Sequence, residues 1–182
     1  MSVQGQVVSL SSSAQHSFSK QVRESVELIA GIGIAGDAHA GRTVQHRSRV
    51  AADPAQPNLR QVHVIPIELL EVLASQGFEL KPGDLGENML TRGIELQALP
   101  RGTHLAFPSG AKLEVTGLRN PCAQIEDFRP GLLGKMVWRD AGGAMVRRAG
   151  IMAVVLTGGH IGLNDTIVVS LPDLPHLALE RV

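Results

Sequence analysis

This sequence of 182 residues contains one cysteine and has a formal net charge of zero. The single cysteine, Cys122, excludes an internal disulfide and any metal cluster with several cysteine ligands. Because a free thiol persists in a reducing compartment, we expect the protein to be cytoplasmic. Lys and Arg together number 17, as do Asp and Glu, so no overall field attracts nucleic acid or an anionic membrane.

Long hydrophobic runs are also missing. No window approaches the roughly 20 apolar residues that a membrane-spanning helix requires, and Met1–Leu10 lacks the basic and apolar stretches of a secretory signal. Hydrophobic residues nevertheless make up 43% of the chain and charged residues 19%, which predicts a substantial buried core. Neither a repeat nor a linker divides the sequence, so we predict a single domain over residues 1–182.

Glycine and proline, by contrast, are abundant, with 20 and 10 residues, which favours frequent turns between short strands. Alternating or β-branched runs predict strands over Gly5–Leu10, Val22–Ile29, Gln61–Ile65, Thr103–Phe107, Ala111–Leu118, Ile151–Leu156 and Thr166–Leu171, with another from about Met89. The clearest helix is Pro66–Gln76, which has proline at its first position, an apolar stripe and Gly77 as its cap. Many short strands with few helices indicate a barrel or a sandwich.

Three connections are less regular. Val44–Asn58 is polar and is predicted to be a long connection, while Glu126–Trp138 has helical character interrupted at Pro130. Gly158–Asp165, between the last two strands, is interpreted as a hairpin loop.

Cys122 is the first candidate for chemistry. It follows a predicted strand, directly behind Pro121, and Arg119 precedes it by three residues. A thiolate near basic groups can ligate a soft metal or carry a persulfide. The alternative is an inert, buried thiol, since free cysteine is among the residues most often buried.

A second candidate is the polar stretch around Asp37, His39 and His46. Carboxylate and imidazole are ordinary ligands of divalent metals, although this spacing matches no structural zinc motif. The same residues are also suited to hydrogen bonding a polar ligand, with Arg42, Arg47 and Arg49 facing an anion. The remaining alternative is a glycine-rich turn in which Asp37 caps backbone amides.

Gly83–Asn88 and the other histidines carry weaker signals. The Gly-x-x-Gly pattern at Gly83–Gly86 is suited to cradling an anion with backbone amides, but such turns are common. His63, His104 and His176 lack a partner pattern and are interpreted as ordinary strand or surface histidines.

Taken in order, these segments resemble the MOSC domain, named for the C-terminal part of molybdenum cofactor sulfurases. The similarity runs from about Gly5 to Ser170 and rests on the ordered set rather than on one motif. The matching segments are Gly36–Gly41, Gln45–Arg47, Leu85–Asn88, Arg119–Cys122 and Gly158–Gly162.

The resemblance implies a mostly β fold, a compact irregular barrel with a few short helices. It implies that Cys122 is the catalytic residue, acting as a molybdenum ligand or as a sulfur acceptor. The residues that it assigns to binding of the molybdenum cofactor (molybdopterin) are Gly36, Asp37, His39, Gly41, His46, Arg47, Glu87, Asn88, Arg119 and Asn120. Arginines and backbone amides suit the phosphate of such a cofactor, and a thiolate suits the metal.

Several functions remain open. One is a small molybdoenzyme that reduces N-hydroxylated or other N–O compounds, with electrons from a flavoprotein or ferredoxin because the chain has no cysteine cluster of its own. A second is a sulfur carrier that receives persulfide sulfur on Cys122 from a cysteine desulfurase, since no pyridoxal-phosphate domain is present. A non-catalytic pterin-binding module and a metal-dependent hydrolase using Asp37, His39 and His46 are further alternatives. An exposed edge strand would allow an oligomer.

Overall fold

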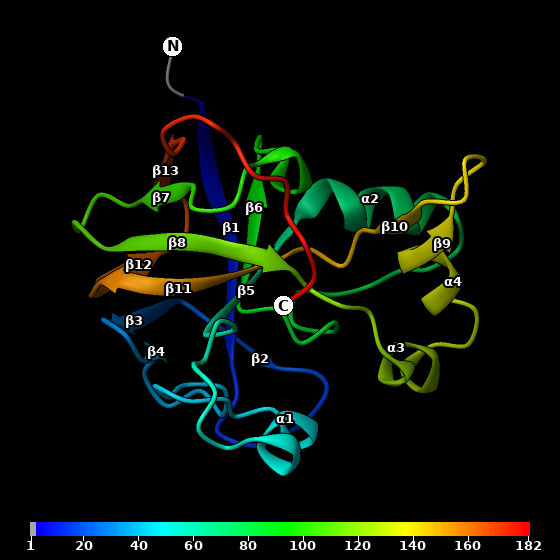
Figure 1. The fold of residues 1–182 in the computed structure, drawn as a ribbon, viewed down its shortest axis with the longest axis horizontal. Coiled ribbons are helices and arrows are strands. Elements are labelled where there is room, and N and C mark those ends of the chain that lie inside the picture. The colour runs from blue at the N-terminus through cyan, green and yellow to red at the C-terminus, as the bar shows by residue number, and fades with distance from the viewer. Residues whose placement is uncertain (1–2) are drawn as a thin grey trace.

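The chain folds around a closed barrel of seven strands (Figure 1). The structure is a computed structural model that describes residues 3–182. Its strands are β1 (Gln4–Ser12), β2 (Gln21–Arg23), β3 (Ser25–Ile29), β4 (Gly33–Ile34), β5 (Val62–Pro66), β6 (Met89–Arg92), β7 (His104–Ala106), β8 (Lys112–Leu118), β9 (Val137–Arg139), β10 (Met145–Arg147), β11 (Ile151–Thr157), β12 (Gly159–Gly162) and β13 (Thr166–Ser170). The helices are α1 (Arg47–Ala52), α2 (Ile67–Ser75), α3 (Ala123–Phe128) and α4 (Leu133–Met136), with a 3₁₀ turn, η1, at Leu96–Ala98.

The strand β1 closes the barrel. The order of the strands around the barrel is β13, β7, β8, β11, β5, β6 and β1, and the pairing of β1 with β13 closes the ring. All of these neighbours are antiparallel except β5 and β6, which are parallel. The first residues of β1 pair with β13, and the rest pair with β6 and then β2, across a register shift between Val7 and Ser9. Such an irregularity bends a strand, which lets β1 join both edges of the sheet.

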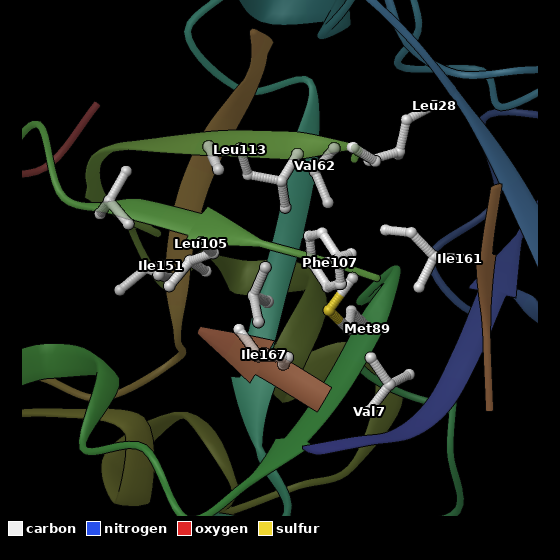
Figure 2. Close-up of a cluster of buried hydrophobic side chains, with 14 of the residues drawn as sticks. Val7, Leu28, Val62, Met89, Leu105, Phe107, Leu113, Ile151, Ile161 and Ile167 are labelled. Atoms are coloured by element: carbon white, nitrogen blue, oxygen red, sulfur yellow. The ribbon is translucent and has the colours of Figure 1, made fainter. Parts of the chain in front are cut away.

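The barrel interior is filled by apolar side chains that recur at every second residue. In β5, Val62 and Val64 lie inside, in one cluster with Ile151 of the neighbouring strand β11 and Leu113 of β8. All four of these side chains are fully buried. Figure 2 shows Val62, Leu113 and Ile151 in this cluster. Because strand side chains alternate between faces, His63 and Ile65 must point to the outside of the barrel.

The helices α2, α3 and α4 cover part of that outer face. Ile65 of β5 belongs to a second apolar cluster, together with Leu73 of α2, Ile125 of α3 and Met136 of α4. Figure 1 shows α2 crossing the upper part of the barrel, with α3 and α4 at the right and α1 at the bottom of the view. The strand β5 is therefore covered on both faces, which explains why its side chains are almost all buried.

Most predicted elements are confirmed, among them the helix after Pro66, which spans Ile67–Ser75 and is followed by Gly77 at φ +88°. The hairpin interpretation of Gly158–Asp165 is wrong: Gly159–Gly162 forms β12, which pairs with β3, while β11 and β13 pair with other strands. The partner of β12 lies more than a hundred residues earlier in the chain, so no local pattern indicates this pairing. Likewise the predicted strand Val22–Ile29 divides into β2 and β3, and the connection 44–58 contains α1.

The interrupted segment 126–138 is partly helical, as expected. The helix α3 ends at Phe128, α4 begins at Leu133, and the next residues form β9, which pairs with β10. Among residues 3–182, no helix is both long enough and apolar enough to cross a membrane.

Candidate functional site

A pocket of about 450 Å³ lies against the outer face of β5 and β11. His63 and Met152 are cross-strand partners in these two strands, and both line the pocket. The remaining walls come from the segment 16–20, from the loop and helix 39–49, from the segments 58–60 and 86–88, and from the residues that follow β8. The volume is in the range of small-molecule and cofactor sites.

Positive charge dominates this pocket. The cationic side chains that line it are Lys20, Arg47, Arg49, Arg60 and Arg119, and none of the lining residues is an Asp or Glu. Lys20 and Arg119 are buried, whereas Arg47 on α1 is exposed. Lys20 is paired with Asp37 behind the wall, but Arg119 has no ion pair among the described residues, and an unpaired buried cation favours an anionic ligand.

Cys122 lies at the edge of this charged region. It is half-buried and occupies the position before the first residue of α3, where Pro121 turns the chain away from β8. Its Sγ lies 3.6 Å from Oε1 of Gln124, and the residue is close enough to Arg119 to influence that guanidinium group. The cysteine is therefore accessible and next to a buried guanidinium group.

Among residues 3–182, neither Arg119 nor Arg60 forms an ion pair with a carboxylate. Nη1 of Arg119 is buried without a hydrogen-bond partner among the described residues. Burial, together with the charges of Arg119 and Arg49, lowers the pKa of Arg60 to about 10, and the neighbouring Cys122 opposes this shift. Burial also lowers the pKa of Arg119, again opposed by Cys122. An anion placed beside Cys122 would relieve the repulsion between the two guanidinium groups.

Asp37 lies outside the pocket lining and is hydrogen-bonded to residues of the pocket wall. Its carboxylate accepts hydrogen bonds from Lys20 Nζ at 3.1 Å, the backbone N–H groups of Ser13 and His39 at 3.2 and 3.0 Å, and Asn88 Nδ2 at 3.1 Å. Burial alone would raise the pKa of Asp37, but the hydrogen bonds from His39 and the charge of Lys20 hold it well below its usual value. Since its oxygens are already bonded, Asp37 acts as the cap of a glycine-rich turn.

Glu87 and Asn88 are bonded in a similar way. The backbone N–H groups of Gly83 and Leu85 donate to the Glu87 carboxylate, so the Gly-x-x-Gly loop holds a carboxylate of its own chain. Burial raises the pKa of Glu87 to about 7, against the effect of these hydrogen bonds. The Asn88 side chain accepts from the His63 backbone N–H and donates to the Ser11 carbonyl, which ties β5 to β1.

Three histidines form one side of the pocket. His16 packs edge-on against His39, with 5.6 Å between ring centroids, and Nδ1 of His46 lies 2.9 Å from the Ser48 hydroxyl. Burial and the nearby charge of Arg60 lower the pKa of His46 to about 4, so its imidazole is neutral at pH 7. No group of three His, Cys, Asp or Glu residues within 3–182 is arranged to hold a metal ion, and Asp37, His39 and His46 form none.

The sequence-predicted binding residues thus fall into two groups. Those in the pocket wall are His39, His46, Arg47, Asn88, Arg119, Asn120 and Cys122. Those outside the wall are Gly36, Asp37, Gly41 and Glu87. The ionisable pocket residues that the motifs did not indicate are His16, Lys20, Arg60 and His63. His63 had one usable signal, because a polar residue between two buried valines must face the opposite side of its strand.

Comparison with known proteins places this chain in a family. The family model of the MOSC domain matches residues 39–168. YuaD of Bacillus subtilis, whose name assigns it provisionally to metal-sulfur cluster biosynthesis, is 31% identical over 150 residues, which is 75% of this chain and 76% of YuaD.

Solved structures agree on the fold. The crystal structure of YuaD superposes with a TM-score of 0.75 at 24% identity, over 95% of this chain and 99% of that chain. The crystal structure of YiiM from Geobacillus stearothermophilus has a TM-score of 0.64 at 15% identity, over 96% of this chain and 79% of that chain. At these identities the structural matches support the mostly β fold and no more.

Proposed function

This chain belongs to the MOSC domain family, a family associated with the molybdenum cofactor, and on that basis we propose that it binds a molybdenum pterin cofactor with Cys122 as the metal ligand. The observation that carries the proposal is Arg119 beside Cys122, a buried guanidinium group with an unpartnered nitrogen in a pocket that has no carboxylate in its wall.

The side chains present fit such a group. A cysteine thiolate is a soft ligand suited to molybdenum, and arginine forms paired hydrogen bonds with phosphate oxygens. When bound, the cofactor would supply the redox chemistry that reduces N-hydroxylated or related N–O compounds, with electrons from a partner flavoprotein or ferredoxin.

The chain's own residues would then bind the ligand, orient it and shield it from solvent. Arg60 and Arg119 would hold the anionic part of the ligand, while Lys20, already neutralised by Asp37, keeps the neighbouring segment in place. Neutral His46 would contribute hydrogen bonds without adding positive charge. The helix α1, which carries Arg47 and Arg49, would cover the ligand from the outer side.

The test compares molybdenum and pterin content of the wild type and Cys122→Ser, both purified from a host that makes the cofactor. We expect about one molybdenum per chain in the wild type and a loss of most of it in the variant. A matched control is Ser109→Ala, which removes a polar atom outside the pocket lining. Equal molybdenum in both proteins would contradict the role of Cys122 and favour a non-catalytic pterin-binding module.

A second candidate is a sulfur carrier, favoured by the name of the YuaD relative and by the accessibility of Cys122. The Cys122 thiolate would attack the outer sulfur of a persulfide on a cysteine desulfurase. A new S–S bond would form on Cys122, and the desulfurase cysteine would leave as a thiolate. Mass spectrometry after incubation with a desulfurase and cysteine would show one added sulfur on the wild type and none on Cys122→Ser. If a control carrier is loaded and this chain is not, the sulfur-carrier function is ruled out.

A further inference from the structure

His63 is the buried pocket residue whose role is not explained by the fold. It lies on the outer face of β5, is 5% exposed, and belongs to the pocket wall. Its backbone N–H donates to Asn88 Oδ1 at 3.0 Å, and its backbone carbonyl accepts from the Asn88 N–H at 2.8 Å. The main chain of His63 is therefore fixed on both sides.

The imidazole ring is fixed as well. Nε2 lies 2.7 Å from the Ala149 carbonyl oxygen, and because a carbonyl can only accept, the proton must be on Nε2. This leaves Nδ1 as an acceptor, and no protein group within residues 3–182 is hydrogen-bonded to it. Burial and the charge of Arg119 hold the pKa of His63 well below its ordinary value, so the ring remains neutral.

The other buried polar residues of the pocket are already engaged. Both polar ends of the Asn58 and Asn88 side chains have protein partners, and the Lys20 ammonium group is paired with Asp37. Arg119 Nη1 and His39 Nδ1 are the buried pocket atoms without a hydrogen-bond partner among the described residues, and His63 Nδ1 likewise has no protein hydrogen bond there. A ligand that fills the pocket would cover His63 Nδ1 as well, so it must offer a donor to this nitrogen and an acceptor to Arg119, because an unpaired buried polar group is costly.

We propose that His63 is a specificity-determining residue that accepts a hydrogen bond at Nδ1 from an N–H group of the bound ligand. This inference rests on the proposed function: a pterin ring carries amide and amino N–H donors, and its phosphate suits the arginines. Arg119 would then select for the anion, while His63 would select for the heterocycle and fix its orientation.

Two substitutions separate the two nitrogens of the ring. In His63→Gln, the amide nitrogen replaces Nε2 and can still donate to Ala149, but the acceptor at the position of Nδ1 is lost. In His63→Asn, the carbonyl oxygen replaces Nδ1 as an acceptor, but the donor to Ala149 is lost. The first variant therefore tests binding at nearly constant stability, and the second tests stability at nearly constant binding.

The experiment measures the affinity of purified protein for neopterin monophosphate and for inorganic phosphate by calorimetry, together with thermal unfolding. We expect His63→Gln to bind neopterin monophosphate roughly three- to tenfold more weakly, with phosphate affinity unchanged. His63→Asn should unfold at a lower temperature yet keep its pterin affinity within about twofold of the wild type.

Equal loss of phosphate and pterin affinity in His63→Gln would overturn the inference, because it would indicate a general structural effect. Unchanged pterin affinity would overturn it while leaving the proposed function intact. A wild type that binds phosphate but not neopterin monophosphate would overturn both.

Nitrogen NMR of the wild type gives an independent readout that does not depend on any variant. The proton of His63 should be on Nε2 from pH 6 to pH 8, and the Nδ1 resonance should move toward that of a hydrogen-bonded nitrogen when neopterin monophosphate is added. An Nδ1 resonance that stays fixed while other pocket signals shift would refute the contact.

Discussion

Arg119 illustrates how single residues in this pocket are kept for binding rather than for stability. A buried charge stabilises a protein only where partners offset its lost hydration. Arg119 is 8% exposed and its Nη1 has no partner among residues 3–182, although its backbone N–H donates to Gly150 at 3.0 Å. In the ligand-free protein, its side chain should therefore be neutral or unfavourable for folding.

We predict that Arg119→Met leaves the free energy of unfolding of the ligand-free protein unchanged or raises it by about 1 kcal/mol. The same variant should lose the molybdenum and pterin found in the wild type. Urea denaturation and metal analysis measure the two effects separately. The exposed Arg101 provides the matched control, because Arg101→Met should change stability by less than about 0.5 kcal/mol and leave cofactor content intact. A fall of several kcal/mol in Arg119→Met would show instead that Arg119 is structural.

At the scale of elements, the loop 81–88 depends on glycine at a point of close approach to the segment 16–20. Gly83 has φ +88°, and a Cβ there would lie 2.2 Å from the carbonyl oxygen of Lys20. Gly77 has the same φ, but no atom lies within 4 Å of its Cβ position. The two glycines therefore share a backbone conformation and differ in their surroundings.

Gly77→Ala should cost about 1 kcal/mol of unfolding free energy, since only the left-handed backbone conformation is penalised. Gly83→Ala should cost roughly 2–4 kcal/mol more, because the backbone of Lys20 must move. Urea denaturation of both variants gives the difference. Since Lys20 lines the pocket, Gly83→Ala should also weaken binding of neopterin monophosphate, whereas Gly77→Ala should not. Equal losses of unfolding free energy in the two variants would mean that the backbone near Gly83 moves easily, so that its close approach to Lys20 does not limit stability.

The same elements explain how much of the fold could be predicted from the sequence. Alternation is a local signal, and it correctly predicts strands such as Gln61–Ile65, the 103–118 hairpin and the helix after Pro66. The pairing of β12 with β3 and the closure of β1 onto β13 depend on residues far apart in the chain, so no local pattern predicts them.

The pocket residues also divide into those that local motifs indicate and those that only the folded chain brings together. Motif order indicated Cys122, Arg119 and His46, which do line the same pocket. Lys20 and Arg60 belong to no motif, and they become pocket residues only because the barrel brings their segments together. Conversely, Asp37 and Glu87 have the residue types of a binding site, yet their oxygens are bonded to backbone N–H groups and other protein donors. Sequence alone does not show whether a carboxylate is already bonded.

At the scale of the whole molecule, two buried groups give the folding equilibrium opposite dependences on pH. In the unfolded chain, His63 takes up a proton near its ordinary pKa of 6.5, whereas in the fold its pKa lies well below that value. His63 therefore lowers stability as pH falls below about 6.5. Glu87 has its pKa raised from 4.5 to about 7 in the fold, so the folded chain holds this proton longer than the unfolded chain. Glu87 therefore lowers stability as pH rises from about 4.5 to about 7.

Removing either group should leave the pH dependence of stability that the other group causes. The free energy of unfolding of ligand-free protein, measured by urea denaturation from pH 4.5 to pH 8, tests this prediction. Relative to the wild type, His63→Gln should become more stable as pH falls below about 6.5, and Glu87→Gln should become more stable as pH rises toward about 7. Each difference should change by up to about 1.4 kcal/mol per pH unit, the value for one proton. Exposed Glu27→Gln is the control and should follow the wild type at every pH. If both variants track the wild type, neither group changes its proton affinity on folding, and His63 would not be held neutral by its burial beside Arg119.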